Sequence, residues 1–127
     1  MQKAWIALAL GLAGAAFASG EARAAGFDCS KASAPDEKAV CASPQLSALD
    51  SQMTGLWYAY SRVPMLMGSS GNRQDEAEAF LARRRQCGSD VACIGSAYNA
   101  RIATLESEIA SSMNAMAPLV TGGCPQP

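Results

Sequence analysis

Cysteine is the residue type in this chain with the most distinctive chemistry, because its thiolate can form disulfides, bind metal ions or attack substrates. The chain has no Cys-x-x-Cys pair and no histidine, so a redox motif and a zinc site are both disfavoured. We expect structural disulfides, no metal and no other cofactor. The five cysteines are Cys29, Cys41, Cys87, Cys93 and Cys124.

Two local disulfides are favoured, Cys29–Cys41 and Cys87–Cys93. The first would tie an extended N-terminal segment to a short helix, and the second would close the turn at Gly88-Ser89-Asp90. Glycine suits the left-handed position after a helix, and serine or aspartate can cap the next one. Four cysteines allow three connectivities, so the two crossed alternatives stay open at this point.

The fifth cysteine, Cys124, lies in a C-terminal segment with paired glycines and two prolines. We interpret it as an unpaired thiol of the tail. A dimer linked through Cys124 is the less favoured alternative.

Catalysis is not expected, so the protein is predicted not to be an enzyme. Without histidine the chain lacks the base of Ser-His-Asp and Cys-His pairs. Glu76 and Glu78 fall at the start of a predicted helix, where carboxylates complement the helix dipole. The chain also has no glycine-rich phosphate-binding motif of the required form.

Residues 1–24 have the pattern of a secretory signal peptide. Lys3 precedes an uncharged, mostly apolar run from Ala4 to Ala18, and Ala22-Arg23-Ala24 offers a small-residue cleavage site. Ala16-Phe17-Ala18 is a second possible site. The apolar run is short for a membrane span and no other follows it. We therefore expect a soluble periplasmic or secreted protein without a stable membrane span.

Cleavage after Ala24 would leave residues 25–127, enough for one small domain. This part carries eight basic and ten acidic side chains, a net charge of −2. A nucleic-acid-binding protein would need a basic patch, so no nucleic-acid partner is predicted.

Helical periodicity organises the rest of the chain, and no stretch alternates at period two. We predict an all-α fold, a small disulfide-stapled hairpin or bundle of three to four helices. Ser33 is expected to cap the first helix in a capping box with Asp36. The expected segments are a helix over about 34–42, one of about twenty residues from Pro44 to near Pro64, a loop over 64–72, a helix ending at Cys87, a helix from Val91 to near Pro118, a core within about 27–116 and a flexible tail over 118–127.

The predicted loop is the favoured place for a partner contact. A lysozyme cleft holds two carboxylates close together, which serine hydroxyls and an arginine could engage. The competing interpretation is a flexible connector. The candidate contact residues are Ser69, Ser70, Asn72 and Arg73.

Arg84, Tyr98 and Arg101 lie near the turn that the second cysteine pair brackets, and two interpretations compete. They could form a contact patch. The favoured alternative is structural, with the arginine stems along the core rim and the guanidinium groups meeting Asp50 or Glu37.

The spacing of these residues resembles the LprI-like lysozyme-inhibitor N-terminal domain family, over about residues 27–106. The resemblance implies a small secreted or periplasmic helical domain stapled by four cysteines, and one branch of the family is associated with lysozyme inhibition. This chain differs in having Phe80 where the family usually has tryptophan, no lipid-attachment cysteine, the loop at 64–72 and the extra Cys124. The matching positions include Phe27, Asp28, Glu37, Leu49, Asp50, Phe80, Arg84, Tyr98 and Arg101, together with Cys29, Cys41, Cys87 and Cys93.

The sequence thus predicts an exported binding protein that resembles lysozyme inhibitors and occludes a partner, with lysozyme as the candidate. The alternative is a structural or interaction module of the cell envelope without lysozyme contact. A third hypothesis is an adaptor that associates through exposed Met65 and Met67.

Overall fold

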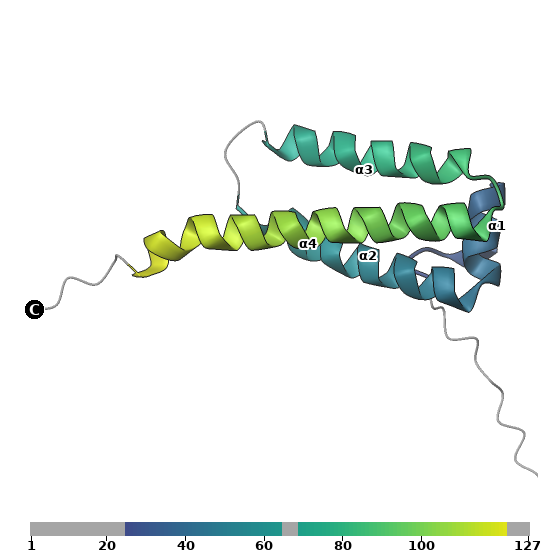
Figure 1. Cartoon of the computed structure of the whole chain (residues 1–127), viewed down its shortest axis with the longest axis horizontal. Helices are drawn as coiled ribbons and strands as arrows, with labels where there is room; N and C mark the ends of the chain where they lie inside the picture. Colours follow the sequence, from purple (N-terminus) through teal and green to yellow (C-terminus); the bar gives the residue numbers. More distant parts are fainter. Residues whose placement is uncertain (1–24, 65–68, 122–127) are drawn as a thin grey trace, which may run out of the picture.

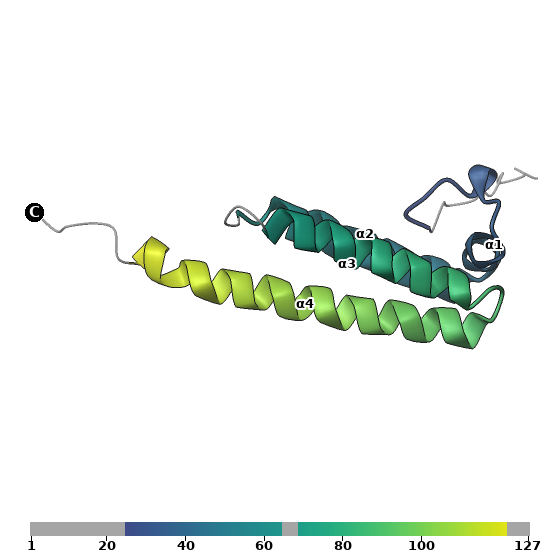
Figure 2. The same ribbon diagram turned by 90° about the horizontal axis from the view of Figure 1, so that it is seen from above.

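The computed structural model describes residues 25–64 and 69–121, and these form a small all-α bundle with no strand. The predicted signal peptide, Met65, Met67 and Cys124 lie outside the described residues. Helices α2, α3 and α4 run side by side, and α1 lies across one end (Figures 1 and 2). The elements are a short 3-10 turn η1 (Cys29–Lys31), α1 (Pro35–Ala42), α2 (Pro44–Arg62), α3 (Ser69–Gln86) and α4 (Val91–Thr121).

The start of α1 differs by one residue from the predicted capping box. The N-cap is Ala34 and not Ser33, and the Glu37 carboxylate accepts hydrogen bonds from the backbone amides of both residues, at 3.1 and 2.9 Å. Asp36 takes no part in the cap because its side chain is buried and points to Arg84. Glu37 therefore has the part in the capping box that was predicted for Asp36, because its carboxylate accepts from the backbone amide of the N-cap residue.

Helix α2 begins and ends as its sequence predicts. The Ser43 hydroxyl accepts a hydrogen bond from the Leu46 amide at 3.3 Å, and Pro44 occupies the first turn. The helix ends at Arg62, two residues before Pro64. Leu46 and Tyr60 of this helix are buried.

The predicted loop over 64–72 is wrong in its second half, because α3 already begins at Ser69. A single glycine, Gly71, costs a helix about 1 kcal/mol and does not stop it. Arg73 offsets such a cost, because its guanidinium donates to the carbonyl oxygens of Val63 at 2.8 Å and Ser61 at 3.4 Å. These hydrogen bonds join the start of α3 to the end of α2.

The turn between α3 and α4 has the predicted chemistry. Gly88 has a φ of +57°, the left-handed conformation expected after a helix. The Asp90 carboxylate accepts a hydrogen bond from the Cys93 amide at 2.9 Å and caps α4. Both favoured disulfides are present, with Cα–Cα distances of 5.8 Å for Cys29–Cys41 and 5.6 Å for Cys87–Cys93.

Helix α4 is longer than predicted, since it continues through Pro118 to Thr121. Proline so close to the end of a helix removes one hydrogen bond, and its φ fits the helix. The Tyr60 hydroxyl near the end of α2 lies 3.4 Å from Glu108, so residues 109–121 extend past α2. Figures 1 and 2 show this projection, which we call the α4 overhang. It contains no charged residue.

The core lies where α4 packs against the other helices. Its two largest members, Phe80 of α3 and Tyr98 of α4, meet edge to face with ring centroids 5.2 Å apart. The cluster is completed by Val40, Leu46, Ile94 and Ala97.

We predict that replacing Cys29 and Cys41 together by serine lowers the free energy of unfolding by about 3 kcal/mol, because the unfolded chain gains loop entropy. The Cys87 and Cys93 double replacement should cost slightly less, about 2.4 kcal/mol, because it opens a shorter loop. Urea unfolding of both variants and the parent would measure this. A parent-like midpoint for either variant would contradict the prediction.

Candidate functional site

Four buried polar side chains, one from each helix, meet inside the bundle near the end that α1 crosses (Figure 1). They are Asp36 of α1, Asp50 of α2, Arg84 of α3 and Tyr98 of α4, and none is more than 5% exposed. Burial of charge is unfavourable unless partners compensate it. The contacts among these four residues therefore determine whether the helices can pack in this arrangement.

The four side chains form one directed chain of hydrogen bonds. Arg84 donates through Nε to Asp36 at 2.7 Å and through Nη1 to the Tyr98 hydroxyl at 3.0 Å. Tyr98 in turn donates to Asp50 at 2.7 Å. Asp50 lies 3.9 Å from the Arg84 guanidinium, so its closest donor among these side chains is the tyrosine.

The protonation states follow from this geometry. Burial, then the hydrogen bond to Asp50 and its negative charge, raise the pKa of Tyr98 well above its ordinary value, so its hydroxyl stays a donor. Burial alone would lower the pKa of Arg84, but its hydrogen bonds to Asp36 and Tyr98 outweigh burial and raise it. Arg84 and Tyr98 therefore both keep their protons near neutral pH.

A cavity of about 410 Å³ opens beside the network, at the N-terminal segment. Its volume lies within the ordinary range of small-molecule sites. The wall combines apolar side chains with charges of both signs, and the Phe27 ring centroid lies 5.6 Å from Arg84 Cζ. The lining includes Phe27, Met53, Leu81, Asp28, Glu37, Asp50, Lys31, Arg84 and Arg85.

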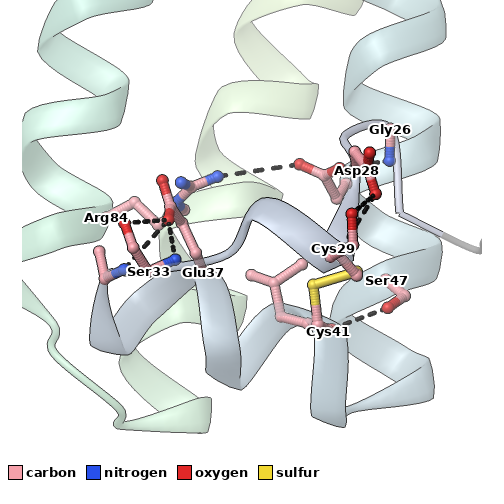
Figure 3. Close-up of a disulfide and its surroundings, with 12 residues drawn as sticks. Gly26, Asp28, Cys29, Ser33, Glu37, Cys41, Ser47 and Arg84 are labelled. Carbon is pink, nitrogen blue, oxygen red and sulfur yellow. Dashed lines mark hydrogen bonds and ion pairs between the residues drawn. A yellow bond between two sulfur atoms is a disulfide. The ribbon is translucent and has the colours of Figure 1, made fainter.

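Five of the positions that carry the family resemblance line this one cavity, although the sequence separates them widely. The Cys29–Cys41 disulfide holds the N-terminal segment over α1 there, with Asp28 and Glu37 on either side (Figure 3). Asp28 accepts hydrogen bonds from Ser30, and Glu37 caps α1. The carboxylates of Asp28 and Glu37 therefore already accept hydrogen bonds from within the chain.

Arg84 is buried as the structural interpretation predicts, and it meets the predicted Asp50 at 3.9 Å, but its closest partner is a residue that was not predicted. Its short ion pair is with Asp36 and not with Asp50 or Glu37. The sequence places Asp36 in the first turn of a helix, where an acidic residue is ordinarily explained by the helix dipole. Its burial depends on α3, forty-eight residues further along, and no local signal reports it.

Arg101 lies apart from this network, between α2 and α3. Its Nη1 is 3.3 Å from a Glu76 oxygen, and its Cζ is 5.7 Å from the Trp57 ring centroid. The side chain is 7% exposed. Arg101 thus packs along the core rim as predicted, but with Glu76 as its acidic neighbour.

Two of the four predicted contact residues, Asn72 and Arg73, already have partners within the chain. Arg73 is only 8% exposed and its Cζ lies 4.5 Å above the Tyr60 ring, so its guanidinium is engaged within the bundle. Asn72 is exposed and donates to Glu76 at 3.2 Å. Ser69 and Ser70 belong to the first turn of α3.

The fold and the network define a small disulfide-stapled helical bundle with an ionic core. Comparisons with protein-family models, curated proteins and solved structures gave no match to this chain. Among the helices within residues 25–64 and 69–121, none combines the length and the apolar character needed to cross a membrane. The same residues contain no cluster of three or more cysteine or acidic side chains able to hold a metal ion.

We predict that Arg84→Leu lowers the free energy of unfolding by about 3–5 kcal/mol, because Asp36 is left as an uncompensated buried charge. Tyr98→Phe should cost about 1–3 kcal/mol, since Asp50 loses its closest side-chain donor. Arg83→Leu, an exposed neighbour on the same helix, is the control and should change stability by less than about 0.5 kcal/mol. Equal losses for Arg83→Leu and Arg84→Leu would contradict the structural role.

The hydrogen bonds of the Glu37 carboxylate predict that the fold becomes less stable in acid. Hydrogen bonds from the Ser33 and Ala34 amides lower its pKa below the ordinary value of 4.5 in the folded state. Its contribution to stability is therefore complete above about pH 4.5 and is lost as the pH falls through the folded pKa. Thermal unfolding of Glu37→Gln from pH 3 to 7 should show a smaller loss of Tm on acidification than the parent. Parallel curves would refute this.

Proposed function

We propose that this protein is an exported, non-enzymatic helical binding protein that occludes a partner, with lysozyme as the candidate. The resemblance to lysozyme inhibitors suggests the partner. Two disulfides in a small domain support an oxidising extracellular or periplasmic location. The buried titratable side chains form hydrogen bonds with one another, which favours a binding function over catalysis. They are Asp36, Asp50, Arg84 and Tyr98.

The observation that carries the proposal is the contrast between the two ends of the bundle. One end holds both disulfides and α1, whereas the other carries the first turn of α3 beside the α4 overhang (Figures 1 and 2). Met113 on the overhang is 61% exposed. An exposed methionine on an uncharged helical segment offers another protein an adaptable apolar contact.

The first turn of α3 is the part suited to an acidic cleft. Its free backbone amides carry the positive end of the helix dipole, and this turn contains no acidic residue. The two carboxylates of a lysozyme cleft would complement this turn, and Arg73 is no longer part of the proposed contact.

A charge placed on this turn tests the proposal. Ser70→Asp should preserve α3 or stabilise it, because an acidic residue suits a helix start, yet it should repel an acidic cleft. We expect at least a tenfold loss of lysozyme inhibition. Ser96→Asp, an exposed serine on α4, introduces the same charge elsewhere and should leave inhibition within twofold.

The same experiment distinguishes lysozyme inhibition from the alternative function, an interaction module of the cell envelope. If the parent protein binds no lysozyme from a panel of structural classes at micromolar concentration, the protein is better explained as an interaction module of the cell envelope. The uncharged overhang would serve that function equally well. Equal inhibition by Ser70→Asp and Ser96→Asp would remove the first turn of α3 from the contact.

A further inference from the structure

The N-terminal segment is bound directly to a buried carboxylate. The Gly26 amide donates to Asp50 Oδ2 at 2.6 Å, and Ala25 packs against the hydrophobic core. A Cβ atom at Gly26 would collide with the Thr54 side chain of α2. Only glycine lets the backbone come this close, so the segment is held against α2 from its first described residues (Figure 3).

Asp50 has less positive charge around it than its burial requires. It is 2% exposed, and its two short hydrogen bonds come from neutral donors, Tyr98 and the Gly26 amide. Arg84 lies 3.9 Å away and makes its short ion pair with Asp36. Two buried carboxylates therefore share one buried guanidinium.

The surrounding charged groups do not close this deficit. Around the cavity, Lys31 and Arg85 are exposed, while Asp28 and Glu37 add negative charge on the same wall. Among the described residues, Lys31, Arg84 and Arg85 are the only cationic side chains that line the cavity. The nearest place for an additional positive charge is the backbone just before Gly26.

Cleavage after Ala24 would create that charge. A signal peptidase adds water across the Ala24–Ala25 peptide bond, so that the carbonyl carbon of Ala24 gains the hydroxyl and the nitrogen of Ala25 gains a hydrogen. The resulting amine takes up a proton at neutral pH. The new ammonium is one residue from the Gly26 amide, so backbone geometry places it within about 7 Å of Asp50.

We propose that the α-ammonium of Ala25, formed when the leader is removed, is a ligand of Asp50 and completes the charge balance of the ionic core. This inference rests on the export proposed above, because it needs the leader and its cleavage after Ala24. Before cleavage the same nitrogen is a neutral amide, so processing stabilises the fold. Cleavage after Ala18 would leave the Ala25 nitrogen a neutral amide, with the ammonium six residues earlier in the chain.

The test compares the chain 25–127 with a free and with an acetylated N-terminus, since the acetyl group reproduces the neutral amide of the precursor. At pH 6.5 we expect acetylation to lower Tm by about 4 °C or more. In an Asp50→Asn background the same modification should change Tm by less than about 1 °C, because the two changes remove one interaction. Equal Tm values for the free and acetylated parent would overturn the proposal.

The pH dependence has a defined sign. A paired α-ammonium has its folded-state pKa raised above the ordinary value of about 7.7–8.0. The difference in Tm between free and acetylated chains should be complete below that value and should vanish as the pH rises through the folded pKa. A difference that is constant from pH 6 to 11 would contradict the pairing.

A direct titration keeps the test decisive if Asp50→Asn does not fold. Dimethylation with ¹³C labels the amine and retains its charge, and NMR then reports its pKa. We expect a raised pKa in the chain that begins at Ala25 and an ordinary pKa when Gly-Ser precedes Ala25. An ordinary pKa in both chains would overturn the proposal. A raised pKa in a protein that binds no lysozyme would refute the proposed partner and leave this inference standing.

N-terminal sequencing of the protein recovered from an exporting cell tests the processing step itself. A chain that begins at Ala25 supports the proposal, and a chain that begins at Ser19 overturns it.

Discussion

The ion pair between Arg84 and Asp36 is the interaction on which the rest of the structure depends. A guanidinium that is 5% exposed costs far more than a surface charge unless carboxylates and hydrogen-bond acceptors surround it. Here the acceptors come from three other helices, so the charge is compensated only when all four helices occupy their native positions. The network thereby gives the bundle a unique arrangement that apolar packing alone would specify less sharply.

Helix α3 shows why a buried ionic network is useful in this chain. Among the described side chains of this helix, the only buried apolar one is Phe80, and the other buried ones are Arg73 and Arg84. Both arginines lie against aromatic rings, Arg73 over Tyr60 and Arg84 near Phe27, within the range of cation–π attraction. Arginine stems and aromatic faces thus replace part of the aliphatic packing that a more hydrophobic helix would supply.

The sequence predicts features set by neighbours in the chain and misses those set by distant contacts. The bounds of α2, the left-handed Gly88 and the two disulfides follow from local signals, and the structure contains them. Asp36 and Arg73 look like ordinary surface charges, because their burial is determined by helices that the local sequence does not report. The early start of α3 has the same origin, since hydrogen bonds from Arg73 to the end of α2 compensate the cost of Gly71 in its first turn.

The disulfides and the ionic core stabilise different aspects of the fold. The cysteine pairs are only 12 and 6 residues apart, so they fix the N-terminal segment and one interhelical turn and cannot by themselves align three long helices. Alignment depends on the buried network, which lies close to the stapled end, and on Arg73 and Arg101, which join the helices further along. A disturbance of Arg73 should therefore be felt at the first turn of α3, which its hydrogen bonds join to the end of α2. A surface presented to a partner at that end is positioned by the buried charges and not by the sulfur atoms.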